Sequence, residues 1–279
     1  MTITRRQAAD LLDRHDVHPS RALGQNFVVD PNTVRRIARL AGIEPGDHVV
    51  EVGAGLGSLT LALAETGADL TAVELDRHLL PVLEEVLAGC EPAPRVVHGD
   101  ALRLDWSTVL AGGDRWQLVA NLPYNVATPL VLDILDTVPA IDRMLVMVQR
   151  EVGERLAAGP RTPAYGIPSV KVAYWATAEV VGRVGPTVFL PRPKVESVLV
   201  RIVRRPAPAS RADPARLFAL VRAGFGQRRK MLRRSLAGLV GADDFDRSGI
   251  ASDARAEELS VIEWGRLAGA TAADDDGGE

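Results

Sequence analysis

The sequence predicts an α/β protein in which a doubly wound sheet of parallel strands is followed by a small all-helical domain. Short apolar runs alternate with helical patterns from about residue 48 to residue 148, and such alternation is typical of a parallel sheet covered by helices. A Pro/Ala/Ser-rich stretch at 205–213 interrupts the pattern, and only helical patterns follow it. At 279 residues the chain is long enough for one large and one small domain.

Local patterns place the individual elements. Asp30 and Pro31, for example, are typical of the N-cap and first turn of a helix. We expect helices at 5–14, 30–41, 58–65, 76–87, 128–137, 149–158, 214–226, 228–240 and 260–270. We expect strands at 48–52, 69–73, 95–98, 117–120, 144–148, 178–184 and 196–203. The predicted domains are residues 1–204, a linker at 205–213, a helical domain at 214–270 and a disordered acidic tail at 271–279.

Composition excludes several classes of protein. No apolar run reaches the 18–20 residues or so that a membrane span needs. The basic N-terminus is not followed by a continuous apolar segment, so no signal peptide is expected. Cys90 is the only cysteine, which excludes an intrachain disulfide and a cysteine-rich zinc site and indicates a reducing, cytoplasmic compartment. The histidines lack metal-ligand spacing, so no metal site is expected.

Charge is distributed unevenly along the chain. The net charge is −3, but residues 201–234 hold eleven Lys or Arg and one acid, Asp213, a local balance of +10. Such a segment is typical of a basic surface that binds phosphates. The alternative is a solvated basic helix face.

A glycine-rich turn follows the first predicted strand of the sheet. The motif EVGAGLG, residues 51–57, would place Gly53 and Gly55 where a ligand approaches the backbone at the start of a helix. The dinucleotide fingerprint G-x-G-x-x-G would need its third glycine at position 58, which is serine here. The motif also lacks the Lys-Ser/Thr of a phosphate-binding P-loop. By itself the motif indicates little more than a tight turn.

Two acids follow the next two predicted strands. Glu74 lies 21 positions after Gly53 and can accept hydrogen bonds from both hydroxyls of a ribose. Asp100, followed by Ala101, can accept one from an adenine amine. Each acid alone could be a helix N-cap or a surface residue. The three features in order, at successive strand ends, predict a pocket for an adenosine ligand.

The fourth strand of the series ends in Asn-Leu-Pro-Tyr, residues 121–124. An aromatic amine is a poor nucleophile, and the side-chain oxygen of Asn121 with the carbonyl of Leu122 could accept its two N–H bonds as positive charge develops. Pro123 would fix the turn and Tyr124 could stack on the base. The alternative is a strand-terminating turn with a core tyrosine.

At this point the sequence resembles the rRNA adenine dimethyltransferases, which use S-adenosylmethionine, and within them the bacterial small-subunit branch linked to kasugamycin sensitivity. The resemblance runs from Leu23 to about Ala268. It rests on LGQNF (23–27), EVGAGLGSLT (51–60), AVELD (72–76), GDAL (99–102), NLPYNVATPL (121–130), FLPRPKVESVLVRI (189–202) and FGQRRKMLRRSL (225–236). The fold that it implies is a Rossmann-like methyltransferase sheet with a small helical C-terminal domain.

The resemblance also implies roles for individual residues. The implied cofactor-binding residues are Asn26, Val28, Gly53, Gly55, Glu74, Asp100, Ala101 and Asn121. The implied catalytic and target-base residues are Asn121, Leu122, Pro123, Tyr124 and Phe189. Tyr124 and Phe189 would sandwich a base flipped out of its stack. A phenylalanine such as Phe189 is more often a core residue, but its Pro-flanked setting favours an exposed side chain.

The implied substrate is a pair of adjacent adenosines in the hairpin loop near the 3′ end of 16S rRNA, each methylated twice within an assembling small subunit. The sequence leaves the oligomeric state open, and a monomer is the default expectation. Basic side chains after the linker would contact rRNA phosphates: Arg222, Arg228, Arg229, Lys230, Arg233 and Arg234. The sequence departs from the family pattern at Arg192, where proline is usual, and at Val126-Ala127, where Ile-Ser is usual.

Three alternatives remain open on sequence. A large-subunit rRNA methyltransferase of the macrolide-resistance type would share the catalytic motifs and differ in the C-terminal domain. A non-catalytic ribosome-assembly or transcription factor would keep the fold only to bind RNA, although Glu74, Asp100 and Asn121 are intact. A nicotinamide dehydrogenase is opposed by the glycine spacing and by the Asn-Leu-Pro-Tyr turn.

Overall fold

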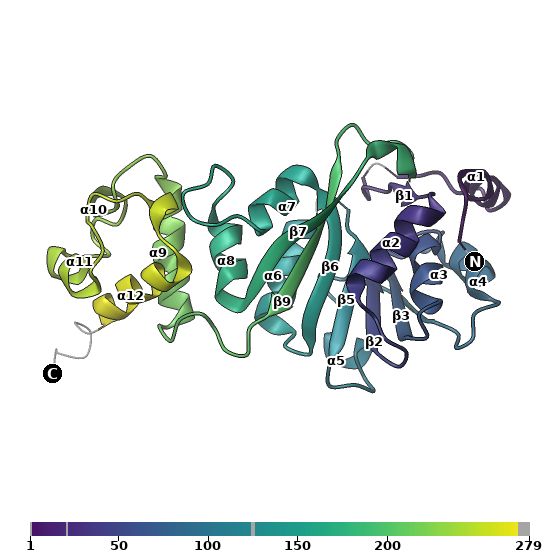
Figure 1. The fold of residues 1–279 in the computed structure, drawn as a ribbon, viewed down its shortest axis with the longest axis horizontal. Helices are drawn as coiled ribbons and strands as arrows, with labels where there is room; N and C mark the ends of the chain where they lie inside the picture. Colours follow the sequence, from purple (N-terminus) through teal and green to yellow (C-terminus); the bar gives the residue numbers. More distant parts are fainter. Residues whose placement is uncertain (1, 21, 124–125, 273–279) are drawn as a thin grey trace. The chain divides into compact units, whose positions relative to one another are not determined.

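The computed structural model describes residues 2–20, 22–123 and 126–272 (Figure 1). The chain divides into two compact units. The first is formed by Met1–Gly153 and Glu179–Arg204, and the second by Glu154–Ala178 and Arg205–Glu279.

The first unit contains a seven-stranded sheet in the order β4-β3-β2-β5-β6-β9-β7, of which only the start of β7, residues 176–178, is assigned to the second unit. These strands are β2 (His48–Val52), β3 (Asp69–Glu74), β4 (Arg95–His98), β5 (Trp116–Asn121), β6 (Ile141–Gln149), β7 (Ala176–Val184) and β9 (Ser197–Arg204). The order reverses between β3-β2 and β5-β6, so a crevice for ligands is expected at the carboxyl ends of β2 and β5.

The predicted α/β class is confirmed, but the sheet is not parallel throughout. Strands β4, β3, β2, β5 and β6 are parallel, whereas β9 pairs antiparallel with β6, from Arg143↔Val203 to Gln149↔Ser197. Strand β9 begins opposite the end of β6, so the pair needs no crossover helix. The expected parallel arrangement is therefore wrong for this strand.

Helices of the first unit flank the sheet (Figure 1). They are α1 (Arg5–Arg14), α2 (Pro31–Ala41), α3 (Ser58–Ala64), α4 (Leu80–Leu87), α5 (Trp106–Val109), α6 (Ala127–Thr137) and α7 (Arg150–Leu156), the last of which continues into the second unit. The predicted cap is present, since the Asp30 carboxylate accepts a 2.8 Å hydrogen bond from the Thr33 N–H. Ile37 of α2 packs with Leu63 of α3 and Val119 of β5 in one apolar core.

A short ribbon that the sequence analysis did not anticipate joins distant segments. Strand β1 (Phe27–Val28) pairs antiparallel with β8 (Phe189–Leu190), with Val28 opposite Phe189. The pairing fixes the segment that precedes α2 and buries both strands' inner side chains.

The second unit is helical and includes a segment that sequence patterns assigned to the first domain. Its helices are α8 (Ile167–Trp175), α9 (Pro214–Gly226), α10 (Leu232–Ser235), α11 (Ala242–Ser248) and α12 (Val261–Ala272). Residues 154–178 belong here because Tyr165 and Tyr174 are buried in one core with Leu217 and Trp264. The Tyr165 hydroxyl also donates a 2.9 Å hydrogen bond to the Leu259 carbonyl. Residues 273–279, most of the expected tail, lie outside the described residues.

The helix expected at 228–240 is wrong over most of its length, because only 232–235 are helical. The backbone N–H groups of Leu232 and Arg233 donate instead to the carbonyls of Ala254 and Ser252, at 2.7 and 2.9 Å. Bonds to a distant segment replace those that would continue a helix from α9.

Candidate active site

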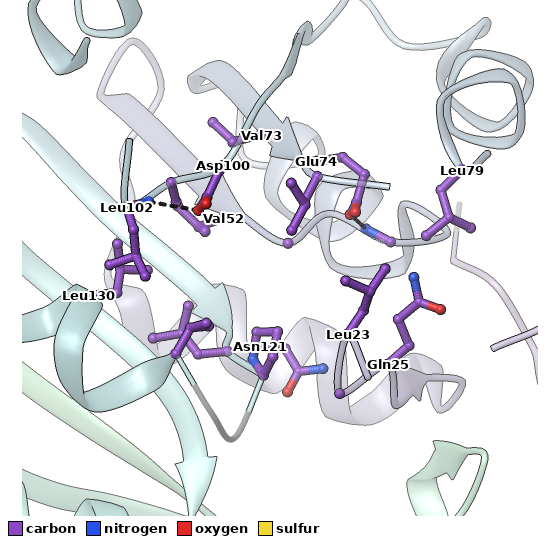
Figure 2. Close-up of a pocket in the computed structure, with 18 of the residues that line it drawn as sticks. Leu23, Gln25, Val52, Val73, Glu74, Leu79, Asp100, Leu102, Asn121 and Leu130 are labelled. Atoms are coloured by element: carbon purple, nitrogen blue, oxygen red, sulfur yellow. Dashed lines mark hydrogen bonds between the residues drawn. The ribbon is translucent and has the colours of Figure 1, made fainter. Parts of the chain in front are cut away.

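The crevice at the carboxyl ends of the parallel strands is lined by segments from five parts of the first unit (Figure 2). They are residues 22–27, the turn after β2, the ends of β3 and β4, and the turn after β5 with the start of α6. Seven of the eight predicted cofactor-binding residues line it: Asn26, Gly53, Gly55, Glu74, Asp100, Ala101 and Asn121. The structure thus brings together residues from distant parts of the sequence, while their roles stay predictions.

The glycine turn depends on backbone conformations that other residues rarely adopt. Gly53 and Gly55 have φ angles of +77° and +59°, in the left-handed region. A Cβ atom at Gly55 would also lie 2.9 Å from the Phe27 ring. The N–H groups of Gly53 and Gly55 are bonded to the Val73 carbonyl and the Glu74 carboxylate, so the turn is tied to β3, and a side chain at Gly55 would disturb it.

Glu74 is a buried carboxylate held by backbone donors. Its side chain accepts hydrogen bonds from the N–H of Gly55 at 2.7 Å and from the N–H of Asp76 at 2.8 Å. Burial raises the pKa of the Glu74 carboxyl, against the opposing effect of these N–H groups. Each oxygen keeps a second lone pair, so the fixed carboxylate can still accept from the two hydroxyls of a ribose.

Asp100 and apolar side chains form the other end of the crevice. One Asp100 oxygen accepts a 3.0 Å hydrogen bond from the Leu102 N–H, which fixes the carboxylate (Figure 2). Leu75 and Leu102 line the crevice and remain 48% and 39% exposed, an unusual exposure for large apolar side chains. A flat ring lying against them would cover this apolar surface and place an exocyclic amine near Asp100.

Asn121 is oriented by the backbone of the N-terminal segment. Its Nδ2 donates a 3.0 Å hydrogen bond to the carbonyl of Asn26, which leaves Oδ1 as an acceptor. Leu122 and Pro123 follow it along the crevice wall, and the Leu122 N–H is bonded to the Met147 carbonyl at 3.0 Å. Tyr124 lies outside the described residues.

Two predicted site residues lie elsewhere. Phe189 is 1% exposed and packs in the same apolar core as Ile37 and Leu63, so the expectation of an exposed ring is wrong. The pairing of β8 with β1 explains the difference, because it directs the ring toward the core. Val28, its partner, is also buried and lines a smaller neighbouring cavity rather than the crevice.

Glu51 lines that smaller cavity and was missed by the sequence analysis. It is 1% exposed, and burial raises the pKa of its carboxyl to about 8. Its Oε2 and the Ser58 hydroxyl have no hydrogen-bond partner in the described part of the chain. A charged residue among the apolar positions of the strand, two positions before Gly53, was the signal that could have identified it.

Gln25 was also missed, although it belongs to the quoted LGQNF motif. Its side chain accepts a 2.7 Å hydrogen bond from the Ser20 N–H and donates a 2.8 Å hydrogen bond to the Asp76 carboxylate. It therefore connects the N-terminal segment to the strand end that carries Glu74.

The basic residues of the second unit differ from one another in their surroundings. Arg228 is partly buried, with its guanidinium 2.6 Å from Glu257 and bonded to the Pro163 carbonyl at 3.0 Å. The other five predicted RNA-contacting residues have exposed side chains and no ion pair within the described ranges: Arg222, Arg229, Lys230, Arg233 and Arg234. Arg228 is thus engaged in holding the unit together.

The described residues contain no group of three or more His, Cys, Asp or Glu side chains placed to hold a metal ion. Over the same residues, no helix is long and apolar enough to cross a membrane.

Comparisons with known proteins agree with the geometry. The family described as ribosomal RNA adenine dimethylase matches residues 18–272. A Streptomyces coelicolor ribosomal RNA small subunit methyltransferase A is 48% identical over 262 residues, covering 90% of this chain and 91% of the relative. A Bifidobacterium adolescentis protein of the same description is 45% identical, covering 95% and 91%.

Two solved structures share the fold. The 23S rRNA methyltransferase ErmE is 26% identical, with a TM-score of 0.67, and the match covers 88% of this chain and 100% of ErmE. A Plasmodium falciparum dimethyladenosine transferase is 21% identical, with a TM-score of 0.72, covering 85% and 94%.

Proposed function

This chain belongs to the ribosomal RNA adenine dimethylase family, and on that premise we propose that it methylates two adjacent adenosines in the 3′-terminal hairpin loop of 16S rRNA. Each exocyclic amine receives two methyl groups from S-adenosylmethionine. The observation that carries the proposal is the convergence of Glu74, Asp100 and Asn121 on one crevice.

The crevice fits S-adenosylmethionine by the chemistry of its groups. Glu74 supplies two fixed acceptor oxygens for the ribose hydroxyls, and Asp100 supplies an acceptor for the adenine amine. Leu75 and Leu102 supply apolar surface for the flat ring. When bound, this cofactor supplies an electrophilic methyl group at a sulfonium centre.

Asn121 performs the central task in our proposal. Its Oδ1 accepts one N–H of the target amine, because Nδ2 is engaged by the Asn26 carbonyl, and the Leu122 carbonyl accepts the other N–H. These bonds hold the nitrogen lone pair in line with the methyl group and stabilise the positive charge that develops on nitrogen. The excess proton leaves to solvent after the transfer, so no strong general base is required.

The second unit supplies the RNA-binding surface in this proposal. The five exposed basic side chains would contact phosphates around the target loop, whose bases are already partly unstacked and can be flipped at a lower cost. We further propose that the protein acts as a monomer in the cytoplasm, on an assembling small subunit.

The second candidate is a large-subunit rRNA methyltransferase, favoured by the match to ErmE. Small-subunit relatives are 45–48% identical to this chain, whereas ErmE is 26% identical. This difference supports the small subunit. A non-catalytic RNA-binding factor would have no need to keep three crevice acceptors in place.

The test is methyl transfer from labelled S-adenosylmethionine to small subunits that lack the modification, followed by nucleoside analysis. We expect dimethyladenosine in 16S rRNA with the wild type and none with Asn121→Ala. Label in large-subunit rRNA would move the proposal to the second candidate. Binding of subunits without any label would favour the non-catalytic factor.

A further inference from the structure

The segment that lines one wall of the crevice, residues 22–26, is tied down by two side-chain hydrogen bonds. At one end Gln25 donates to Asp76 at 2.8 Å, and next to it the carbonyl of Asn26 accepts from Asn121 at 3.0 Å. The segment's other side-chain bonds are local, such as Asn26 Nδ2 to the Gly24 carbonyl at 3.0 Å. These two bonds are therefore its polar links to the crevice walls among the described residues.

Asp76 joins Gln25 to the residue predicted to hold the ribose. Its carboxylate accepts from Gln25, while its backbone N–H donates to Glu74 at 2.8 Å. The second Asp76 oxygen accepts from the His78 N–H at 3.0 Å, which fixes the carboxylate in a turn. Figure 2 shows Leu23 and Gln25 at the same end of the crevice as Glu74 and Leu79.

The carbonyl of Asn26 determines which way the Asn121 amide faces. A side-chain amide has one acceptor oxygen and one donor nitrogen, so a carbonyl facing it selects the nitrogen. The oxygen then remains as an acceptor, and in the proposed function it accepts from the target amine. If the carbonyl moved away, the amide could rotate and present N–H groups to an amine that needs acceptors.

We propose that Gln25 is a positioning residue. Its hydrogen bond to Asp76, called the clasp below, holds the Asn26 carbonyl where it orients Asn121 for methyl transfer. The inference rests on the proposed function for the chemical role of Asn121. Holding this wall of the crevice and orienting the amide then depend on the same hydrogen bond, so the clasp contributes to both cofactor binding and the rate of transfer.

Gln25→Ala breaks the clasp, and the double variant described next rebuilds it, without changing the net charge. Asp76→Asn alone removes one negative charge and sets its amide nitrogen against a donor, either Gln25 Nε2 or the His78 N–H. The double variant Gln25→Glu/Asp76→Asn reverses donor and acceptor, because the new amide at position 76 would donate to the new carboxylate at position 25. That carboxylate would also still accept from the Ser20 N–H. The matched control is Gln7→Ala, which removes a different side-chain bond, to the Thr4 N–H at the start of α1.

Three measurements on the full-length protein test the proposal. They are hydrogen exchange of residues 22–26 without cofactor, calorimetric affinity for S-adenosylmethionine, and kcat at saturating cofactor. We expect Gln25→Ala to speed exchange, to weaken affinity and to lower kcat, with the two losses multiplying to about tenfold, the effect of losing one well-formed hydrogen bond. The double variant should recover most of each loss, and Gln7→Ala should match wild type.

The outcomes separate the possible failures. Wild-type exchange and kcat in Gln25→Ala would overturn the clasp. Weaker affinity with unchanged exchange, not restored in the double variant, would also overturn it and indicate direct contact of Gln25 with cofactor. If Gln25→Ala does not fold, the same measurements are made on Asp76→Asn and on Gln25→Glu/Asp76→Asn, and recovery in the double variant is required. Loss of methyl transfer in the wild type itself would reject the proposed function, while exchange and affinity would still test the clasp.

Discussion

The crevice of the first unit and the basic surface of the second unit hold their charged groups in opposite ways. Glu74 is 6% exposed and fixed by two backbone N–H groups, whereas Arg229, Lys230, Arg233 and Arg234 extend into solvent. A buried and fixed group has no alternative partner, so its loss cannot be compensated. Exposed cations act together and are screened by salt. Function should therefore depend sharply on single crevice residues and gradually on the basic surface.

The largest expected effect is that of Asn121→Ala. Removing the acceptor for the target amine should lower kcat by about 10²–10³, the range found when one preorganised transition-state partner is removed. Methyl transfer to undermethylated small subunits measures it, with the exposed Asn32→Ala as control. A loss of less than about tenfold would mean that the crevice does not depend on this amide.

Glu74→Gln should chiefly weaken cofactor binding. One carboxylate oxygen becomes an amide nitrogen, which cannot accept from a ribose hydroxyl, so affinity should fall by roughly 10–100-fold, or about 1.4–2.7 kcal/mol. Calorimetry with S-adenosylmethionine measures this, and Glu84→Gln on the exposed face of α4 is the control. Equal cofactor affinities of Glu74→Gln and Glu84→Gln would show that Glu74 does not bind the cofactor.

Glu51 extends the comparison to stability. Because burial raises the pKa of Glu51 from 4.5 to about 8, the folded protein keeps its proton where the unfolded chain loses it. The resulting stabilisation is complete below about pH 4.5 and is lost as pH rises through about 8. Glu51→Gln should remove this pH dependence. Between pH 5 and pH 9, the free energy of unfolding of the variant should rise by roughly 2–4 kcal/mol relative to that of the wild type. Denaturant unfolding measures it, and parallel pH profiles would contradict it.

The smallest effects are expected on the basic surface. Replacing Lys230, Arg233 or Arg234 by Gln should weaken RNA binding by a few-fold each and reduce the slope of log affinity against log salt by about 1. Arg228→Gln should leave that slope unchanged and lower stability by about 0.5–1 kcal/mol, because it loses its pairing with Glu257. A reduced salt dependence for Arg228→Gln would show that Arg228 does contact RNA phosphates.

Motifs at strand ends could be interpreted from sequence because their geometry is local. A parallel strand, a tight turn and a helix place Gly53, Glu74, Asp100 and Asn121 at one edge of the sheet wherever such strands pair in the usual order. The structure shows that edge and that crevice. The family resemblance, stated on the same motifs, is confirmed by the match over residues 18–272.

Long-range partners could not be predicted in this way. Phe189 is buried because β8 pairs with β1, and Arg228 is partly buried because Glu257 lies beside it. Residues 154–178 join the second unit because their tyrosines pack against helices that follow much later in the chain. None of these contacts leaves a periodic pattern in the sequence.

The sequence by itself determined the alternation of strands and helices, the position of the crevice and the chemical groups available there. Those properties depend on hydrophobic period and turn chemistry, which act over a few residues. The tertiary structure alone decided which of those groups are buried, which are paired, and which way the Asn121 amide faces. Burial and hydrogen-bond orientation depend on neighbours that only the folded chain brings within about 3 Å.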